Sequence, residues 1–124
     1  MPTLKTQARQ KTAFLSGAVA GHRPDLLGEP YADADGTAYL STFGIPIMVY
    51  AAPGPVLGAV RDRAVARGLG TAVFTDAMFS TGNDIDNRVV VAAVAGPELV
   101  LAGLALVGPR NAVDKSVKGA VLHP

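Results

Sequence analysis

The chain has 124 residues, of which 49% are hydrophobic and 17% are charged. This length fits one domain, and the apolar content supplies a core and excludes a disordered chain. Eleven Lys and Arg oppose ten Asp and Glu, and a formal charge of +1 argues against a large nucleic-acid footprint. The lack of Cys excludes disulfides and thiolate-bound metals.

The sequence has no segment typical of a signal peptide or a membrane span. The longest nearly uncharged stretch is Val89–Val107, and Gly, Pro and Glu residues interrupt it, which is wrong for a membrane helix. We therefore expect a cytoplasmic protein without membrane contact, with one domain over residues 1–124.

The first third of the chain predicts one helix and one turn. Residues 1–10 lack a clear period, whereas Gln10–Ala20 has helical spacing. The face expected to point inward consists of Ala13, Phe14, Gly17 and Ala18. Asp33–Gly36 is typical of a turn that closes a short hairpin against Tyr39–Thr42.

The middle of the chain predicts a strand, a helix and a second strand. Ile45–Ala51 and Thr71–Thr75 are apolar runs typical of strands. Pro53–Gly68 has helical spacing, with an inward stripe of Val56, Leu57, Val60 and Ala64. Because the connections are short, this order predicts a right-handed parallel crossover.

The last third begins with a segment that fits both a strand and a helix. In Asp84–Ala95, three consecutive valines favour a strand, but an N-terminal Asp and the apolar spacing favour a helix, which we predict. Leu99–Val107 follows as a strand, Pro109–Val117 as a helix, and Ala120–His123 as a short strand. The predicted fold is α/β, with a small, mostly parallel four-stranded sheet flanked by helices.

Asp76 is the first candidate catalytic residue, because it follows a predicted strand directly. Ligands of open α/β sheets bind beyond the carboxyl ends of strands, where Asp76 could act as a base or orient water. Ser80 in the same loop is a candidate ligand contact. The alternative is that Asp76 caps or ties the loop through backbone hydrogen bonds.

Arg110 and Asn111 form a second candidate site, between a predicted strand and a predicted helix. A helix N-terminus attracts anions and Arg offers a bidentate fork, so phosphate or carboxylate could bind here. An ordinary surface Arg beside a tight turn is the equal alternative.

The other polar clusters indicate structure rather than a metal site. Asn83–Arg88 departs from a calcium loop and is typical of a helix cap with Arg88 in an ion pair. Asp33–Gly36 is typical of a turn, and His22 and His123 lack ligand spacing. No metal and no cofactor are expected.

Several motifs carry a resemblance to the domain-of-unknown-function family 2000 over most of the chain. The motifs are KTAFLSG (11–17), GEPYADADGTAYL (28–40), TDAMFSTGNDIDNR (75–88) and GLALVGPRNAVDKSVKGAVLHP (103–124). That family is similar in fold to type II peptidyl-tRNA hydrolases, so the resemblance implies a cleft at the strand ends.

The resemblance to the hydrolases implies a catalytic pair of Lys11 and Asp76. Asp76 and Ala77 match the hydrolase loop Asp-Ala-Gly-Arg-Thr, but Met78 and Phe79 replace its Gly and Arg, and Ser80 its Thr. Gly103 stands where the hydrolases have a further Thr. Loss of the Arg removes a donor suited to phosphate, which disfavours peptidyl-tRNA itself as the substrate.

Two functional hypotheses follow, with a third that has less support. One is hydrolysis of an ester or acyl substrate, in which Asp76 orients water and Lys11 stabilises the oxyanion, with Ser80 and Arg110 nearby. The other is a non-catalytic module that binds a small anionic ligand or a protein. RNA contact is the third, through Arg61, Arg63 and Arg67.

The N-terminus predicts self-association. The related proteins begin with an apolar strand, and this chain offers only MPTLKTQARQ in its place. A missing or truncated first strand leaves a sheet edge that another chain could pair with. We therefore expect a homodimer.

Overall fold

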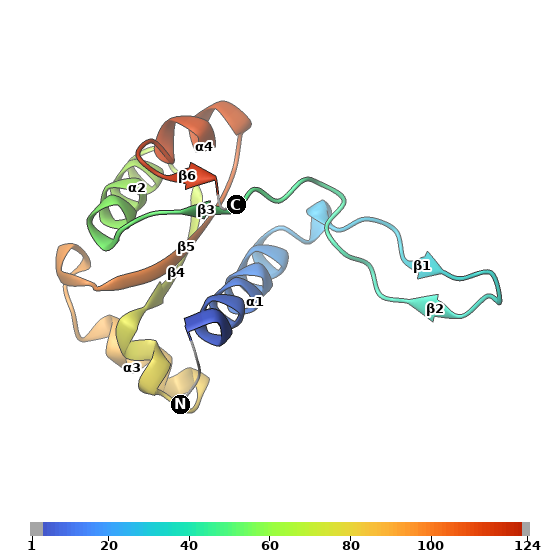
Figure 1. Cartoon of the computed structure of the whole chain (residues 1–124), viewed down its shortest axis with the longest axis horizontal. Helices are drawn as coiled ribbons and strands as arrows, with labels where there is room; N and C mark the ends of the chain where they lie inside the picture. Colours follow the sequence, from blue (N-terminus) through green and yellow to red (C-terminus); the bar gives the residue numbers. More distant parts are fainter. Residues whose placement is uncertain (1–3, 123–124) are drawn as a thin grey trace.

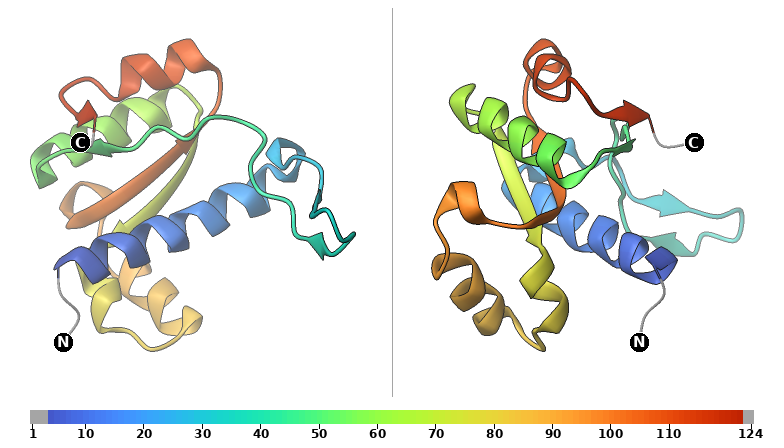
Figure 2. Two further views of the ribbon diagram at one scale, coloured as in Figure 1. Left: turned by 45° about the vertical axis from the view of Figure 1, so that its right-hand side comes forward. Right: turned by 60° about the vertical axis from the view of Figure 1, so that its left-hand side comes forward.

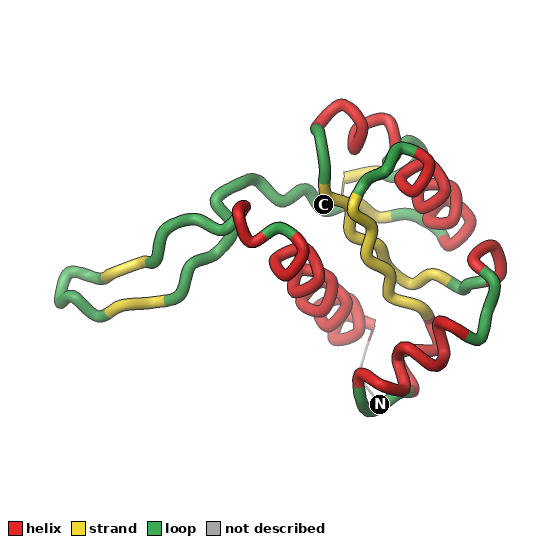
Figure 3. The backbone as a smooth tube through the Cα atoms, turned by 180° about the vertical axis from the view of Figure 1, so that it is seen from behind, coloured by secondary structure: helices red, strands yellow, loops and turns green. Residues whose placement is uncertain are grey.

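We describe the chain from a computed structural model, which places the backbone of residues 4–122 and the side chains of residues 11–122. Its centre is one antiparallel pair of strands, β4 (Gly70–Thr75) and β5 (Leu101–Val107). Helices α1 (Leu4–His22) and α2 (Gly54–Ala66) both pack on these strands. Figures 1 and 3 show the pair lying between the two helices, which explains why β5 is apolar throughout and β4 has no charged residue.

The predicted mixture of helices and strands is confirmed, but the mostly parallel four-stranded sheet is wrong. Strand β3 (Tyr50–Ala51) pairs antiparallel with β6 (Val121–Leu122) and not with β4. Strand β4 pairs with β5 instead. The connection between them, which contains α3 (Asp84–Ala92), begins and ends at the same end of the central strands, so β5 runs antiparallel to β4. The strand–helix–strand pattern therefore does not form the expected parallel crossover.

Most of the predicted strand Ile45–Ala51 is irregular, since only its last two residues pair in β3. Its apolar side chains are exposed instead of buried, namely Ile45, Ile47, Met48 and Val49. We call residues 45–49 the apolar strip. Figure 1 shows it running from the projecting hairpin to β3.

Helix α1 begins at Leu4, six residues before the predicted start, so the described chain has no strand ahead of it. The left view of Figure 2 shows this helix lying across the central strands. Its inward stripe is Lys11, Leu15 and Val19, at a spacing of four residues, and the predicted face is largely exposed. The predicted face consists mostly of Ala and Gly, which are too weakly hydrophobic to show from the sequence which side of α1 is buried.

The core on the α1 side is built around Leu15, Phe74 and Met78. The rings of Phe14 and Phe74 meet edge-on, with their centroids 5.1 Å apart. The ring centroid of Phe79 lies 4.8 Å from that of Phe74. On α2, Val60 and Ala64 are buried as predicted. Helix α4 (Arg110–Ser116) packs on α2. No helix within residues 4–122 is long and apolar enough to cross a membrane.

A β-bulge interrupts the central pair at the end of β4. Phe74 pairs with Gly103 and Thr75 with Leu101, so Ala102 has no counterpart. Such an extra residue kinks the strand and leaves ladder groups unpaired. The Lys11 ammonium donates to the Ala102 carbonyl at 3.0 Å, and α1 therefore compensates the bulge.

Residues 28–44 form a hairpin that we call the arm, with strands β1 (Tyr31–Ala32) and β2 (Ala38–Tyr39). The predicted turn is confirmed, because Asp33 Oδ1 accepts the Asp35 and Thr37 amides and Gly36 has a φ of 83°. The Tyr39 hydroxyl donates to Asp33 Oδ2 at 2.7 Å. Figure 1 shows the arm projecting away from the helices.

The bond between Tyr39 and Asp33 makes the arm sensitive to pH at both extremes. It raises the pKa of the Tyr39 phenol and, with the backbone amides, lowers the pKa of the Asp33 carboxyl. The contribution of Tyr39 is lost as pH rises through its raised pKa, above the ordinary value of about 10. The contribution of Asp33 is lost as pH falls through its lowered pKa.

We predict that Asp33→Asn lowers the pKa of Tyr39 towards its ordinary value, because a neutral amide accepts the phenolic proton less strongly. The measurement is the phenolate absorbance as pH is raised, with the Tyr39→Phe protein identifying the Tyr39 component. Asp35→Asn is the control, since Asp35 accepts no bond from Tyr39. An unchanged Tyr39 titration in Asp33→Asn would contradict the bond.

Candidate functional site

The segment after β4 folds back at once, which opens space at this end of the central strands. It forms a short 3-10 helix over Asp76–Ser80, and the Asp76 amide donates to the Val100 carbonyl at 2.9 Å. Helix α3 then starts behind Asn83, whose side chain accepts the Asp86 amide at 2.8 Å. Arg88 pairs with Asp84, so the predicted capping of this helix, with Arg88 in an ion pair, is confirmed, although the cap is Asn83.

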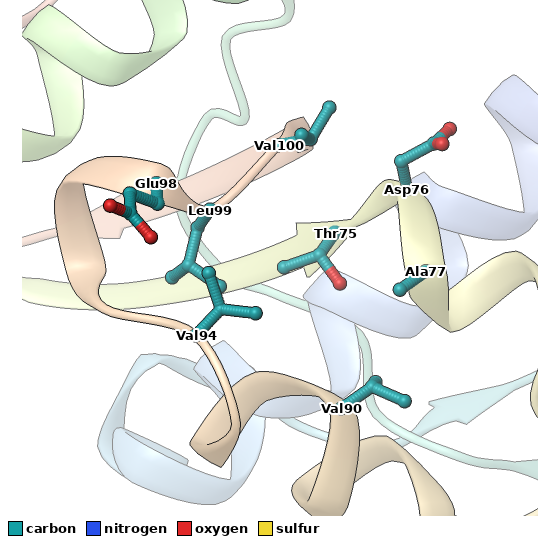
Figure 4. A pocket seen from close by; sticks show the side chains of 8 residues that line it. All are labelled: Thr75, Asp76, Ala77, Val90, Val94, Glu98, Leu99 and Val100. Atoms are coloured by element: carbon teal, nitrogen blue, oxygen red, sulfur yellow. The ribbon is translucent and has the colours of Figure 1, made fainter.

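A hollow of about 200 Å³ lies between this strand end and α3, and we call it the Thr75 hollow. Its lining residues come from the loop after β4, from α3 and from the approach to β5: Thr75, Asp76, Ala77, Val90, Val94, Glu98, Leu99 and Val100. Figure 4 shows these side chains around the hollow. Most of the lining is apolar, as is usual for small-molecule sites.

Thr75 is the most unusual member of the hollow. Its side chain is only 3% exposed, and its hydroxyl has no hydrogen-bond partner. Thr75 is the N-cap of the 3-10 helix and has the arrangement of a capping box with Met78: the Thr75 amide donates to the Met78 sulfur at 3.3 Å, and the Thr75 side chain faces the Met78 amide without the geometry of a hydrogen bond. A buried unpaired hydroxyl costs about 1–3 kcal/mol, so a folded protein rarely keeps one without a reason.

The charged groups of the Thr75 hollow are both carboxylates. Asp76 and Glu98 are exposed at its rim, and the lining has no Lys, Arg or His. In Figure 4 the Asp76 carboxylate points away from the Thr75 hydroxyl. Arg61 on α2 donates to the Gly96 carbonyl at 2.8 Å and so holds the turn that carries Glu98. The hollow therefore has a negative rim and an apolar interior.

A second hollow of about 300 Å³ lies between α1 and the start of α3. It is lined by Phe14, Phe74, Met78, Thr81, Gly82, Asn83, Asp84 and Asn87. Its polar side chains already bond to one another or to the backbone, as Thr81 does to Asn87 and Asn83 does to Asp86. A ligand would have to displace these bonds, which makes the second hollow the weaker candidate.

Lys11 does not line either hollow. Its stem lies over Gly103, where an added Cβ would be 3.6 Å from Lys11 Cδ and 3.2 Å from a Leu15 methyl carbon. Its ammonium is bonded to the Ala102 carbonyl, and Lys11 forms no ion pair with Asp76, both of which lie in the described part of the chain. Lys11 thus acts in this structure as a brace of the bulge near the site.

The other predicted site residues lie apart from the Thr75 hollow. Ser80 is exposed at the end of the 3-10 helix and is not part of the lining. Arg110 and Asn111 follow the C-terminal end of β5, and antiparallel pairing puts that end beside Gly70, at the start of β4. The six residues of β4 separate them from Asp76 by about 15–20 Å. Arg110 is 93% exposed and faces Asp114 at 3.8 Å.

The three arginines considered for RNA have different surroundings. Arg61 pairs with Asp62 as well as Gly96, and Arg63 donates to the carbonyls of Ser116 and Lys118. Arg67 is exposed. Two of the three therefore hold neighbouring backbone. Among the described residues no three His, Asp or Glu side chains cluster as a metal site requires.

Sequence reasoning missed Thr75 and Glu98 as members of the site. Thr75 was read as the end of a buried strand, yet alternation already places it on the sheet face opposite to Phe74. Glu98 is the only acidic residue within Val89–Val107, and a lone charge in an apolar stretch is the signal that could have singled it out.

Comparison with known proteins gives one family and one solved structure. The family model described as "Protein of unknown function (DUF2000)" matches residues 5–124. A protein of unknown function, Atu0240, from Agrobacterium tumefaciens strain C58 has a similar structure, with a TM-score of 0.92 and 34% sequence identity. The match covers 95% of this chain and 87% of that chain. No curated protein matches the sequence.

We predict that Lys11→Met lowers the free energy of unfolding by about 1–2 kcal/mol, because the charged donor to the Ala102 carbonyl is lost while the stem is kept. Denaturant unfolding measures the change. Arg88→Met removes an exposed cation whose ion pair with Asp84 is formed one turn away on the surface of α3, and it should change stability by less than about 0.5 kcal/mol. Equal effects of the two substitutions would show that the bond to the bulge contributes nothing.

Proposed function

The chain belongs to the family of proteins of unknown function DUF2000, and from the geometry of its site we propose that it binds a small molecule in the Thr75 hollow. The ligand has an apolar body and one polar group, a hydroxyl or an ammonium. Binding rather than catalysis is the function that the site supports best. One observation carries the proposal, namely the buried Thr75 hydroxyl that lacks a partner.

The unpaired hydroxyl supports a ligand because its cost disappears on binding. A hydroxyl or amine inside the hollow can bond to Thr75 Oγ1, which both accepts and donates. The free-energy cost of desolvating the Thr75 hydroxyl is already present in the unbound protein. A ligand that pairs with this hydroxyl removes that cost, and the gain adds to its binding affinity.

The lining decides the chemical class of the ligand. Val90, Val94 and Leu99 offer apolar contact, and a volume of about 200 Å³ limits the guest to a few carbon atoms. The carboxylates of Asp76 and Glu98 attract a cation and repel an anion. We therefore favour a neutral or cationic ligand over the anionic one expected from sequence.

Hydrolysis of an ester or acyl substrate is the second candidate function. It is favoured by the position of Asp76, an exposed carboxylate at the rim of the Thr75 hollow, and by the likeness of Asp76-Ala77 to the type II peptidyl-tRNA hydrolase loop. In this version Asp76 orients water, and Lys11 must leave the Ala102 carbonyl to reach an oxyanion. The need for that movement makes hydrolysis the weaker proposal.

We predict that isobutylamine and isobutanol bind in the hollow with dissociation constants on the order of millimolar, whereas isobutyrate binds more weakly. The three share one carbon skeleton, so their differences isolate the polar group. Amide chemical-shift changes in a titration should gather at residues 75–77 and 98–100. Preferential binding of isobutyrate, or shifts that avoid these residues, would reject the proposal.

We predict that Thr75→Val has opposite effects on stability and on binding. Removal of the unpaired hydroxyl should raise the free energy of unfolding by about 1 kcal/mol, and isobutanol binding should weaken roughly fivefold because one hydrogen bond is lost. Thr75→Ser is the control that keeps the hydroxyl. A loss of stability in Thr75→Val would mean that the hydroxyl has a structural role.

The hydrolytic candidate is tested by turnover of an activated ester and of a peptidyl-tRNA mimic. We predict that any activity falls by at least about a hundredfold in Asp76→Asn, because an amide cannot orient or deprotonate water as a carboxylate does. Ser80→Ala is the control from the same loop. Wild-type protein that turns over neither substrate would end this candidate and leave the binding proposal in place.

A further inference from the structure

The arm over residues 28–44 has almost no support from the rest of the molecule. Every residue from 28 to 40 is exposed, and Figures 1 and 3 show the hairpin extending away from the helices. An isolated two-stranded hairpin is at best marginally stable in water. The bonds around Asp33 order its tip, but they bury no apolar surface.

The arm and the apolar strip, which adjoin in sequence, both carry exposed apolar side chains. Leu40 is 90% exposed, and Tyr31 and Tyr39, which face each other across the strands, are more than half exposed. The strip adds Ile45, Ile47, Met48 and Val49 directly after the arm. Contiguous exposure of this kind marks an interaction surface.

The charge of the arm indicates the kind of surface it fits. It carries Glu29, Asp33 and Asp35 and no Lys or Arg. The whole chain has 11 basic and ten acidic residues, so the chain outside the arm has 11 basic residues against seven acidic ones. The arm and the remainder of the same chain are therefore complementary in charge.

We propose that two copies of this chain form a dimer by exchanging arms, so that the arm of each copy lies on the body of the other. The docking surface lies on α2 and α4, which pack antiparallel: Lys115 and Lys118 are exposed at the end of α4, beside the start of α2, and Arg67 is exposed at the opposite end of the pair. The two helices pack on each other, and Arg63 ties the end of α4 to α2. A two-fold arrangement uses both arms equally.

The apolar strip has a defined place in such a dimer. It joins the arm to β3, and β3 pairs with β6, which follows Lys118 by three residues. The strip therefore lies where the two chains cross, and each copy covers the strip of the other. A stable dimer buries about 800 Å² on each partner, so the proposed interface has to cover the arm and the strip together.

The first test is the oligomeric state of the full chain at micromolar concentration, measured by sedimentation or light scattering. Wild-type protein is expected to be a dimer. Leu40→Asp should weaken the dimer roughly tenfold or more, because an apolar anchor becomes a charge in an acidic arm. Ile85→Asp is the matched control: Ile85 is 74% exposed on α3, away from the arm, and its substitution should leave the dimer intact.

The second test reverses the charges on each side of the interface. Glu29→Lys with Asp35→Lys changes the arm, and Lys115→Glu with Lys118→Glu changes the docking surface. Each double variant alone should be largely monomeric, because its arm and body then repel. An equimolar mixture should restore dimers, because the basic arm of one variant meets the acidic body of the other.

A monomeric wild type, or a Leu40→Asp protein that dimerises like the wild type, would overturn arm exchange. A mixture of charge variants that stays monomeric would overturn the docking on α2 and α4. Each variant should still unfold cooperatively, since the substituted side chains are exposed and none packs in the core. The test is independent of the Thr75 hollow.

Discussion

The antiparallel pairing of β4 with β5, held between α1 and α2, sets the position of every other functional feature of this chain. Because the strands run in opposite directions, the end of β4 lies beside the start of β5. The loop with Asp76 and the turn with Glu98 therefore meet at one end, and both line the Thr75 hollow. The same pairing places Arg110 at the other end of the strands, so one cleft cannot contain both Asp76 and Arg110.

The bulge at Ala102 links the stability of the strands to the geometry of the site. It lies opposite the step from Phe74 to Thr75, where the strand gives way to the hollow. Lys11 satisfies the bulge carbonyl, and Gly103 lets α1 approach closely enough for that bond. Lys11 and Asp76 are thus connected through the strand end, with Lys11 as a brace and Asp76 at the rim.

The molecule divides its polar and apolar surface unevenly. The hollow is apolar with acidic groups at its rim, the arm is acidic with exposed apolar side chains, and exposed Arg67, Lys115 and Lys118 follow or end α2 and α4. Neither the unpaired Thr75 hydroxyl nor the unsupported arm contributes to the stability of an isolated monomer. Both features make physical sense when a second molecule is present, a small ligand in one case and another copy in the other.

The sequence by itself determined the local elements. The apolar spacing of α2, the turn at Asp33 and the cap before α3 follow from neighbouring residues, and all three are present. Only the tertiary structure decided the direction of strand pairing, the exposure of Ile45–Val49 and the role of Lys11. An apolar run has the same pattern whether its neighbour is parallel, antiparallel or absent, because its alternation reports burial and not the identity of its partner. The unpaired state of the Thr75 hydroxyl likewise depends on groups far away in the chain, which no local pattern can specify.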